Sequence, residues 1–157
     1  MLFRSYISKS EIINAPAEKI FTLLTDPTRQ NEMNPDFTVL TYTPSAIGGY
    51  DNTWNYKVAG MNFSGESKIA AYEPPSRFVF DTTGGIPSHW EWKLQAQGAS
   101  TNVSLSLDYT MPGSLFGEFF NKLLIERQNE KVVERQIKNL KRMSESSLIV
   151  LNVIKLR

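Results

Sequence analysis

The sequence contains no cysteine and a single histidine, His89. A chain without cysteine forms no disulfide, has no thiol nucleophile and offers no thiolate to a metal. Zinc sites are usually built from several Cys or His ligands, so one histidine argues against such a site. A phosphate-binding glycine motif and a Ser-His-Asp order are not recognisable either. We therefore expect neither a metal site nor a cofactor.

An excess of charge of either sign is also absent, since 17 Lys and Arg residues stand against 16 Asp and Glu residues. Such a balance creates no strong field for a polyphosphate chain or an anionic bilayer, and we expect no nucleic-acid partner. The dense apolar run over residues 148–154 is far shorter than the roughly 20 residues that cross a bilayer. The N-terminus shows no secretory signal pattern. These absences predict no membrane span and a cytoplasmic location.

What the sequence does contain is a long stretch with a two-residue period, from Phe37 to Met111. The alternation is clearest at its end, where residues 103, 105, 107, 109 and 111 are apolar or aromatic and the residues between them are polar. Glycine and proline pairs interrupt the stretch where antiparallel strands would reverse. With a first strand ahead of this stretch we expect seven strands, at about 4–14, 37–43, 52–59, 61–72, 77–82, 86–97 and 101–111.

Helical periodicity appears on both sides of the alternating stretch. After Pro16, apolar residues at helical spacing predict a short helix to about Leu24, and a second helical turn is expected over residues 28–33. From Ser114 to Glu145 a helix of roughly eight turns with one apolar face is predicted, because this stretch lacks proline and has no glycine after position 117. The remaining tail, residues 146–157, could continue the helix, pair with a sheet edge, mediate dimerisation or touch a membrane surface. Both a monomer and a homodimer stay open.

Three stretches of the chain are similar to one protein family. Residues 11–21 (EIINAPAEKIF), 72–78 (YEPPSRF) and 139–145 (NLKRMSE) resemble the polyketide cyclase/dehydrase and lipid-transport group of the START-like, birch-pollen-allergen-like superfamily. The resemblance implies an α+β helix-grip fold, in which a curved seven-stranded antiparallel sheet with two short helices after strand 1 grips a long C-terminal helix. It implies one START-like domain over residues 1–145, followed by the tail 146–157. Carriers, cyclases and quinone-binding proteins all share this fold, so the resemblance alone does not choose a function.

A curved sheet closed by one helix often leaves an apolar cavity, and such cavities bind small molecules. Strand alternation and helical phase select the side chains that would form its wall. For each of them the alternative is plain core packing, because aromatic residues commonly fill cores. The wall candidates are Trp54, Tyr56, Phe78, Phe80, Trp90, Trp92, Tyr109, Phe120 and Leu123.

Charged residues interrupt the apolar stripe of the long helix. Arg127 has nearly the helical phase of Phe120, and Glu130 lies beside it. In one interpretation Arg127 or Glu130 faces the cavity and holds a polar group of the ligand, because a buried charge is costly and usually has a purpose. In the other, these charges are solvated and paired along the helix. His89 is expected on the opposite strand face from Trp90, which argues against a catalytic role.

The residues lead to a ranked set of functions. First stands a noncatalytic carrier or sensor of a small hydrophobic molecule, such as a lipid, a sterol-like ring or a quinone, because the inward faces are aromatic and no convincing catalytic set is present. The rival is a cyclase, dehydratase or aromatase on a polyketide-like substrate, which would use Tyr56, Tyr109, Arg127 and Glu130. A third is a protein-interaction or chaperone-cofactor domain. The sequence predicts a binding fold more firmly than any chemistry.

Overall fold

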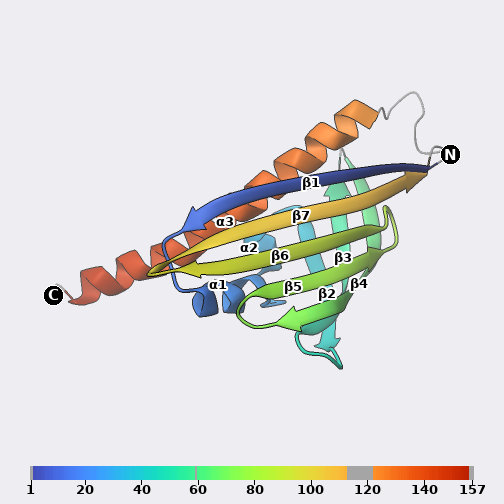
Figure 1. Cartoon of the computed structure of the whole chain (residues 1–157). Coiled ribbons are helices and arrows are strands. Elements are labelled where there is room, and N and C mark those ends of the chain that lie inside the picture. The colour runs from blue at the N-terminus through green and yellow to red at the C-terminus, as the bar shows by residue number, and fades with distance from the viewer. Residues whose placement is uncertain (1, 59, 113–121, 156–157) are drawn as a thin grey trace.

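The protein forms one curved antiparallel sheet that wraps around a long helix (Figure 1). The computed structural model describes the backbone of residues 2–58, 60–112 and 122–155, and the side chains of residues 4–57, 60–111 and 123–146. This is the predicted α+β helix-grip architecture. In chain order the elements are β1 Leu2–Ile13, α1 Ala17–Leu24, α2 Gln30–Met33, β2 Phe37–Pro44, β3 Tyr50–Val58, β4 Met61–Glu73, β5 Arg77–Thr83, β6 Ser88–Gln97, β7 Ser100–Pro112 and α3 Lys122–Lys155.

The strands β2 to β7 form a meander, and β1 joins the sheet beside β7. The spatial order is β1-β7-β6-β5-β4-β3-β2, with antiparallel pairing throughout. Register shifts between Val39 and Thr41 and between Ile69 and Ala71 mark irregularities in β2 and β4. Such bulges bend a strand and increase its twist. The strands consequently change direction across the sheet, and β2 to β4 run steeply to β1 and β7 in Figure 1.

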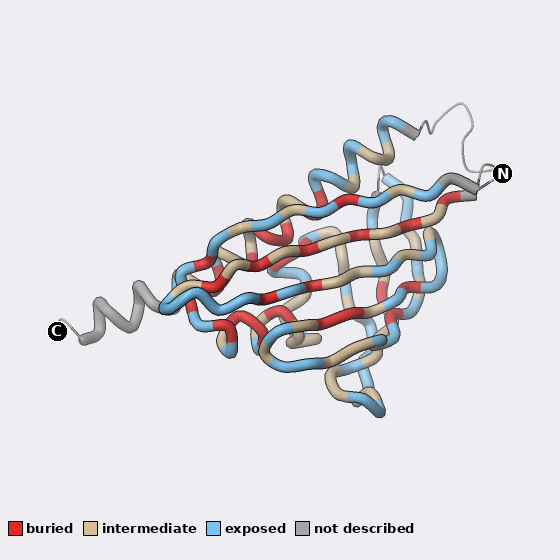
Figure 2. Tube along the Cα trace, in the orientation of Figure 1, coloured by how far each residue is buried: buried red, intermediate tan, exposed pale blue. Residues whose placement is uncertain are grey.

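The inner face of the sheet, defined as the face that α3 covers, is the apolar side of the alternation. Along β7 every second residue is buried and the residues between are half-buried, as the alternating colours of Figure 2 show. A strand directs successive side chains to opposite faces, so this pattern needs no information beyond the local sequence. The buried residues of β7 are the predicted ones, together with Thr101 at its start: Val103, Leu105, Leu107, Tyr109 and Met111.

The solid core occupies one end of the inner face. There Phe21 of α1 and Leu140 of α3 pack with Trp92 of β6, and all three are almost completely buried. Burying a large apolar side chain contributes about 1.5–3 kcal/mol each. Polar contacts also hold α3 at this end, because Asn139 Nδ2 donates to the Met33 carbonyl (2.8 Å) and Glu145 accepts from the Asn14 amide (2.9 Å). The turns of α3 over residues 139–145 are therefore held against this end of the sheet.

The long helix differs from the prediction in its extent. No glycine or proline interrupts residues 122–155, and the backbone is helical up to Lys155. The tail thus continues α3 instead of pairing with a sheet edge, as its strand-like composition had also allowed. Ser114, the predicted helix start, and Phe120 lie outside the described residues. Over the part of the chain that the structure describes, no helix is long and apolar enough to cross a membrane.

Candidate ligand-binding cavity

At the end of the inner face away from the core, the sheet and the N-terminal half of α3 enclose a cavity of about 560 Å³. This volume is in the range of ordinary small-molecule sites. Most of the wall comes from the sheet, α3 covers it, and the α1–α2 region contributes two polar residues. The lining consists of Gln30, Asn34, Phe37, Trp54, Tyr56, Met61, Phe63, Phe80, Thr82, Ile86, Ser88, Trp90, Leu107, Tyr109, Met111, Leu124, Ile125, Gln128, Asn129, Val132 and Gln136.

Aromatic side chains give the wall its shape. Phe80 and Trp90, paired across β5 and β6, stack with their ring centroids 6.0 Å apart, and Phe37 lies 5.6 Å from Trp54. Trp54 lies against β4 at Gly65, where an added Cβ atom would come within 2.5 Å of Trp54 Cζ2. The absence of a side chain at Gly65 therefore allows the indole to lie close to the sheet. The result is an apolar surface of aromatic rings in contact with one another and with the sheet.

A short row of polar side chains crosses this apolar wall. Thr82, Ser88 and Tyr109 are partners on the adjacent strands β5, β6 and β7. Ser88 Oγ accepts a hydrogen bond from Trp90 Nε1 (2.9 Å) and is also bonded to the Thr82 hydroxyl. Among the described residues, however, neither Tyr109 Oη nor Trp54 Nε1 has a hydrogen-bond partner. A buried polar group without a partner costs about 1–3 kcal/mol, so these two groups require an explanation.

A second polar group of the wall lies where α2, β3 and α3 meet. Arg135 Nη2 donates to Asn34 Oδ1 (3.0 Å) and to Asp36 Oδ2 (3.1 Å). The Asn34 oxygen is thereby occupied. Burial raises the pKa of the Tyr56 phenol and Asp36 raises it further, while Arg135 and Asn34 oppose this rise without cancelling it. Tyr56 therefore stays neutral, with its hydrogen-bonding proton in place, through and above the physiological pH range.

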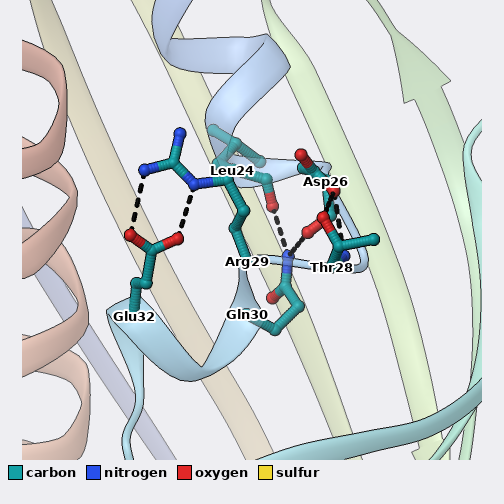
Figure 3. A network of polar contacts seen from close by, with 6 residues as sticks. All are labelled: Leu24, Asp26, Thr28, Arg29, Gln30 and Glu32. Atoms are coloured by element: carbon teal, nitrogen blue, oxygen red, sulfur yellow. Dashed lines mark hydrogen bonds and ion pairs between the residues drawn. The ribbon is translucent and has the colours of Figure 1, made fainter. Parts of the chain in front are cut away.

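Gln30 also lines the cavity, and the turn between α1 and α2 holds its side chain (Figure 3). Its Nε2 donates to the carbonyl oxygens of Leu24 (3.0 Å) and Asp26 (2.9 Å). The Asp26 carboxylate in turn accepts from the Thr28 amide (2.9 Å) and hydroxyl (2.6 Å). These contacts fix the Gln30 side chain at the cavity wall before any ligand arrives.

The cavity lining carries no formal charge in the described part of the chain. Its polar members are amides, hydroxyls and indole nitrogens, and none is Asp, Glu, Lys, Arg or His. His89 is exposed on the strand face away from the cavity and bonds to Asp81. Within the described ranges no cluster of His, Cys, Asp or Glu is arranged to hold a metal ion. The arrangement can therefore bind and orient a molecule, but its lining supplies no group that exchanges a proton near neutral pH.

Of the wall candidates from the sequence, some line this cavity and others do not. Phe78 and Trp92 have the correct strand face but lie in the solid core, where Phe78 packs against Phe21 with ring centroids 6.3 Å apart. The α3 residues Leu123, Arg127 and Glu130 are exposed and are not part of the lining, and Phe120 lies outside the described residues. The candidates that do line the cavity are Trp54, Tyr56, Phe80, Trp90 and Tyr109.

The lining also contains polar residues that sequence reasoning passed over. On α3 these are Gln128, Asn129 and Gln136, and the α1–α2 region adds Gln30 and Asn34. A signal for the helical residues was present, because Gln128 and Gln136 stand four residues on either side of the apolar Val132. Residues at that spacing share one helix face. The charges at 127 and 130 drew the prediction to the neighbouring face instead.

Known proteins share this fold. A model of the family described as polyketide cyclase / dehydrase and lipid transport matches residues 6–145. A START superfamily protein from Mycobacterium smegmatis is 14% identical, covers 90% of this chain and 97% of its own, and has a TM-score of 0.74. A Thermus thermophilus protein is 20% identical, covers 91% of this chain and 99% of its own, and has a TM-score of 0.69. The di-domain ARO/CYC BexL of the BE-7585A biosynthetic pathway is 14% identical, and the match covers 90% of this chain and 50% of that protein with a TM-score of 0.75. No curated protein matches the sequence. At these identities the structural similarities establish the fold.

Proposed function

The chain belongs to the polyketide cyclase/dehydrase and lipid transport family, and on this premise we propose that it binds a small hydrophobic molecule in the cavity between the sheet and α3. The observation that carries the proposal is the cavity itself, about 560 Å³ in volume, with an aromatic wall and a few fixed polar groups. Apolar walls provide affinity through removal of surface from water, and sparse polar groups orient the ligand.

A carrier or sensor fits the cavity better than an enzyme. General acid–base catalysis needs a group that titrates near the working pH within reach of the substrate. The only ionisable side chains in the described lining are the phenols of tyrosines, and the phenol of Tyr56 has a raised pKa. We therefore assign the protein to noncatalytic binding, with a lipid, a sterol-like molecule or a quinone as the ligand.

A cyclase or dehydratase acting on a polyketide-like substrate is the second candidate. The observation in its favour is the pair of phenols, Tyr56 and Tyr109, which could donate hydrogen bonds to a substrate carbonyl. Two other residues of that hypothesis, Arg127 and Glu130, are exposed outside the cavity. The enzyme would thus have donors without a base. Turnover of a poly-β-ketone thioester by the purified protein, lost in Tyr109→Phe, would favour this candidate over the carrier.

The binding function is tested by a matched pair of substitutions on α3. Asn129 lines the cavity, whereas Arg127 lies two residues away and is exposed outside it. We expect Asn129→Trp to fill part of the cavity and weaken binding of apolar probes by about tenfold or more, a loss of about 1.4 kcal/mol. Arg127→Trp should leave the affinity unchanged. Isothermal titration calorimetry with lipid, sterol and quinone panels measures both, and native mass spectrometry detects ligand that copurifies.

Two outcomes would contradict the binding function. If no probe of any panel binds, the cavity is not a ligand site. If Asn129→Trp and Arg127→Trp weaken binding equally while both variants keep the wild-type circular dichroism, the probes bind elsewhere on the protein.

A further inference from the structure

The uncharged lining of the cavity restricts the chemical class of its ligand. Building on the proposed function, we infer that the cavity selects an uncharged apolar molecule that carries a hydrogen-bond acceptor, such as a carbonyl oxygen, and rejects the anionic form of an otherwise identical molecule. Free fatty acids and other apolar carboxylates are thereby excluded as preferred ligands. The missing countercharge disfavours the anion, and the unpaired donors favour a ligand that carries a hydrogen-bond acceptor.

A carboxylate in this cavity would find no cation among the described residues of the lining. Transfer of an ionised group out of water is strongly unfavourable unless an opposite charge and hydrogen bonds compensate it. Arg135 is not part of the lining. Its Nη2 bonds to the lining residue Asn34 and pairs with Asp36 at 3.1 Å, while its Nε is buried without a partner among the described residues. Arg127 is exposed and outside the lining, and the Glu126 carboxylate, which accepts from Ser5 Oγ (2.9 Å), lies on the same helix turn. The described lining therefore offers no opposite charge to an anion.

The unpaired groups of the lining define the complementary feature of the ligand. Tyr109 and Trp54 are only 4% and 6% exposed, and their hydroxyl and indole nitrogen are buried lining atoms without partners among the described residues. An indole nitrogen only donates, and a phenol donates readily. A ligand acceptor at either position would satisfy a group that is otherwise buried at a cost. An ammonium ligand could not satisfy the indole of Trp54, because it has no lone pair to accept with.

The sharpest test compares two probes that differ in one functional group. At pH 8 the ketone 2-tetradecanone is neutral and tetradecanoate is an anion of nearly the same length. Trp54 and Trp90 line the cavity, so the quenching of tryptophan fluorescence reports binding, and calorimetry provides the dissociation constants. We expect the wild-type protein to bind the ketone at least about tenfold more tightly than the carboxylate.

A charge placed in the cavity wall should reverse this preference. Gln128 lines the cavity and Arg127 does not, although they are adjacent in sequence. Gln128→Arg supplies the missing cation, and we expect it to strengthen tetradecanoate binding by about tenfold while the ketone affinity changes less than about threefold. Arg127→Gln removes an existing cation next to it, and both affinities should stay at their wild-type values.

The possible results separate this inference from the binding function on which it rests. Preference for the ketone, reversed only by Gln128→Arg, supports selection by charge. Equal binding of ketone and carboxylate, or loss of carboxylate binding in Arg127→Gln, overturns the inference and leaves the binding function standing. Failure of Gln128→Arg to strengthen carboxylate binding, in a variant that still binds the ketone, also overturns it. Failure of the wild-type protein to bind either probe, or any member of the wider panels, overturns both.

Discussion

Tyr109 has a place in the fold and a proposed role in binding. Its position in β7 follows from alternation, and its ring is buried at the cavity wall. Its hydroxyl nevertheless has no partner among the described residues. Proteins rarely leave such a group buried without a reason, and unpaired groups persist where they serve a ligand. We propose that Tyr109 gives up stability of the free protein in exchange for a contact with the ligand.

Loss of the Tyr109 hydroxyl should therefore raise the stability of the free protein and lower its affinity for a ligand with an acceptor. Tyr109→Phe removes the unpaired hydroxyl and keeps the ring, so we expect the free energy of unfolding to rise by about 1 kcal/mol. Binding of 2-tetradecanone should weaken by about five- to tenfold, whereas binding of naphthalene, which has no acceptor, should not change. Urea denaturation and calorimetry measure the two effects.

A matched control for Tyr109→Phe is available in β1. Tyr6 is 67% exposed, and Tyr6→Phe removes a hydroxyl of the same kind from the solvated surface. We expect it to change neither stability nor affinity. A loss of stability in Tyr109→Phe would show that the hydroxyl is already satisfied in the free protein, which would contradict its role as a free donor.

At the scale of elements, α3 has two functions along its length. Along its length α3 packs against β1, β7, α1 and α2; its later turns contribute to the core, and its earlier described turns cover the cavity. Two adjacent valines mark the division. Val133 belongs to the core cluster, whereas Val132 lines the cavity, although both are almost completely buried.

The same substitution at these two valines should have different consequences. Val133→Ala leaves a void in a packed core, and we expect the free energy of unfolding to fall by about 2 kcal/mol. Val132→Ala enlarges an existing cavity and loses fewer contacts, so the cost should be about 1 kcal/mol or less. Only Val132→Ala should change the affinities for apolar probes, and the change should favour the bulkier probes. Chemical denaturation and calorimetry check the pair, and equal effects on affinity would refute the division of α3.

At the scale of the whole molecule, ion pairs make the stability depend on pH. Hydrogen bonding and attraction from Arg4 lower the pKa of Asp108, and Arg29 does the same for Glu32. For Glu145 burial raises the pKa, but the Asn14 amide and Lys141 outweigh it, so the pKa falls below its ordinary value of 4.5. Exposed pairs contribute little. Glu145 differs because it joins the end of β1 to α3.

A lowered carboxyl pKa means that the ionised form stabilises the fold. This contribution is complete above the unfolded pKa near 4.5 and disappears as the pH falls through the lower folded value. We expect Glu145→Gln to lower the free energy of unfolding by about 1 kcal/mol at pH 7. The difference from the wild type should shrink below about pH 4.5. Urea denaturation from pH 3 to pH 8 measures it.

The contrasting variant for the pH series is Glu32→Gln. Its partner Arg29 lies three residues away, and both side chains of this pair, drawn in Figure 3, are more than a third exposed to water. The pair joins no distant elements, and we expect a smaller effect at pH 7 than for Glu145→Gln. If Glu145→Gln shows the same difference from wild type at pH 3 and pH 7, the carboxylate charge is not the stabilising feature.

The sequence by itself determined the strand pattern, the inner face and the helix-grip order, because each depends on neighbouring residues. Alternation assigns Phe78, Trp92 and Tyr109 to one face without any knowledge of the rest of the chain. The same local rule predicted a helix after Pro16 and another in the C-terminal part. The exact extent of the last helix was less predictable, because its tail is strand-like in composition but follows the helix without a breaking residue.

Only the tertiary structure decided where the inner face is filled and where it is hollow. Phe78 and Trp92 have the same strand face as Phe80 and Trp90, but α1 and the later turns of α3 cover the first pair and leave the second at the cavity. Periodicity defines the side of a strand, not the distance along it at which a helix makes contact. Likewise, the approach of Asn34 to Tyr56 joins residues from the end of α2 and from β3, which no local pattern relates. The uncharged character of the site arises from this packing, since it turns Arg127 and Glu130 outward and brings the amides of α3 to the cavity.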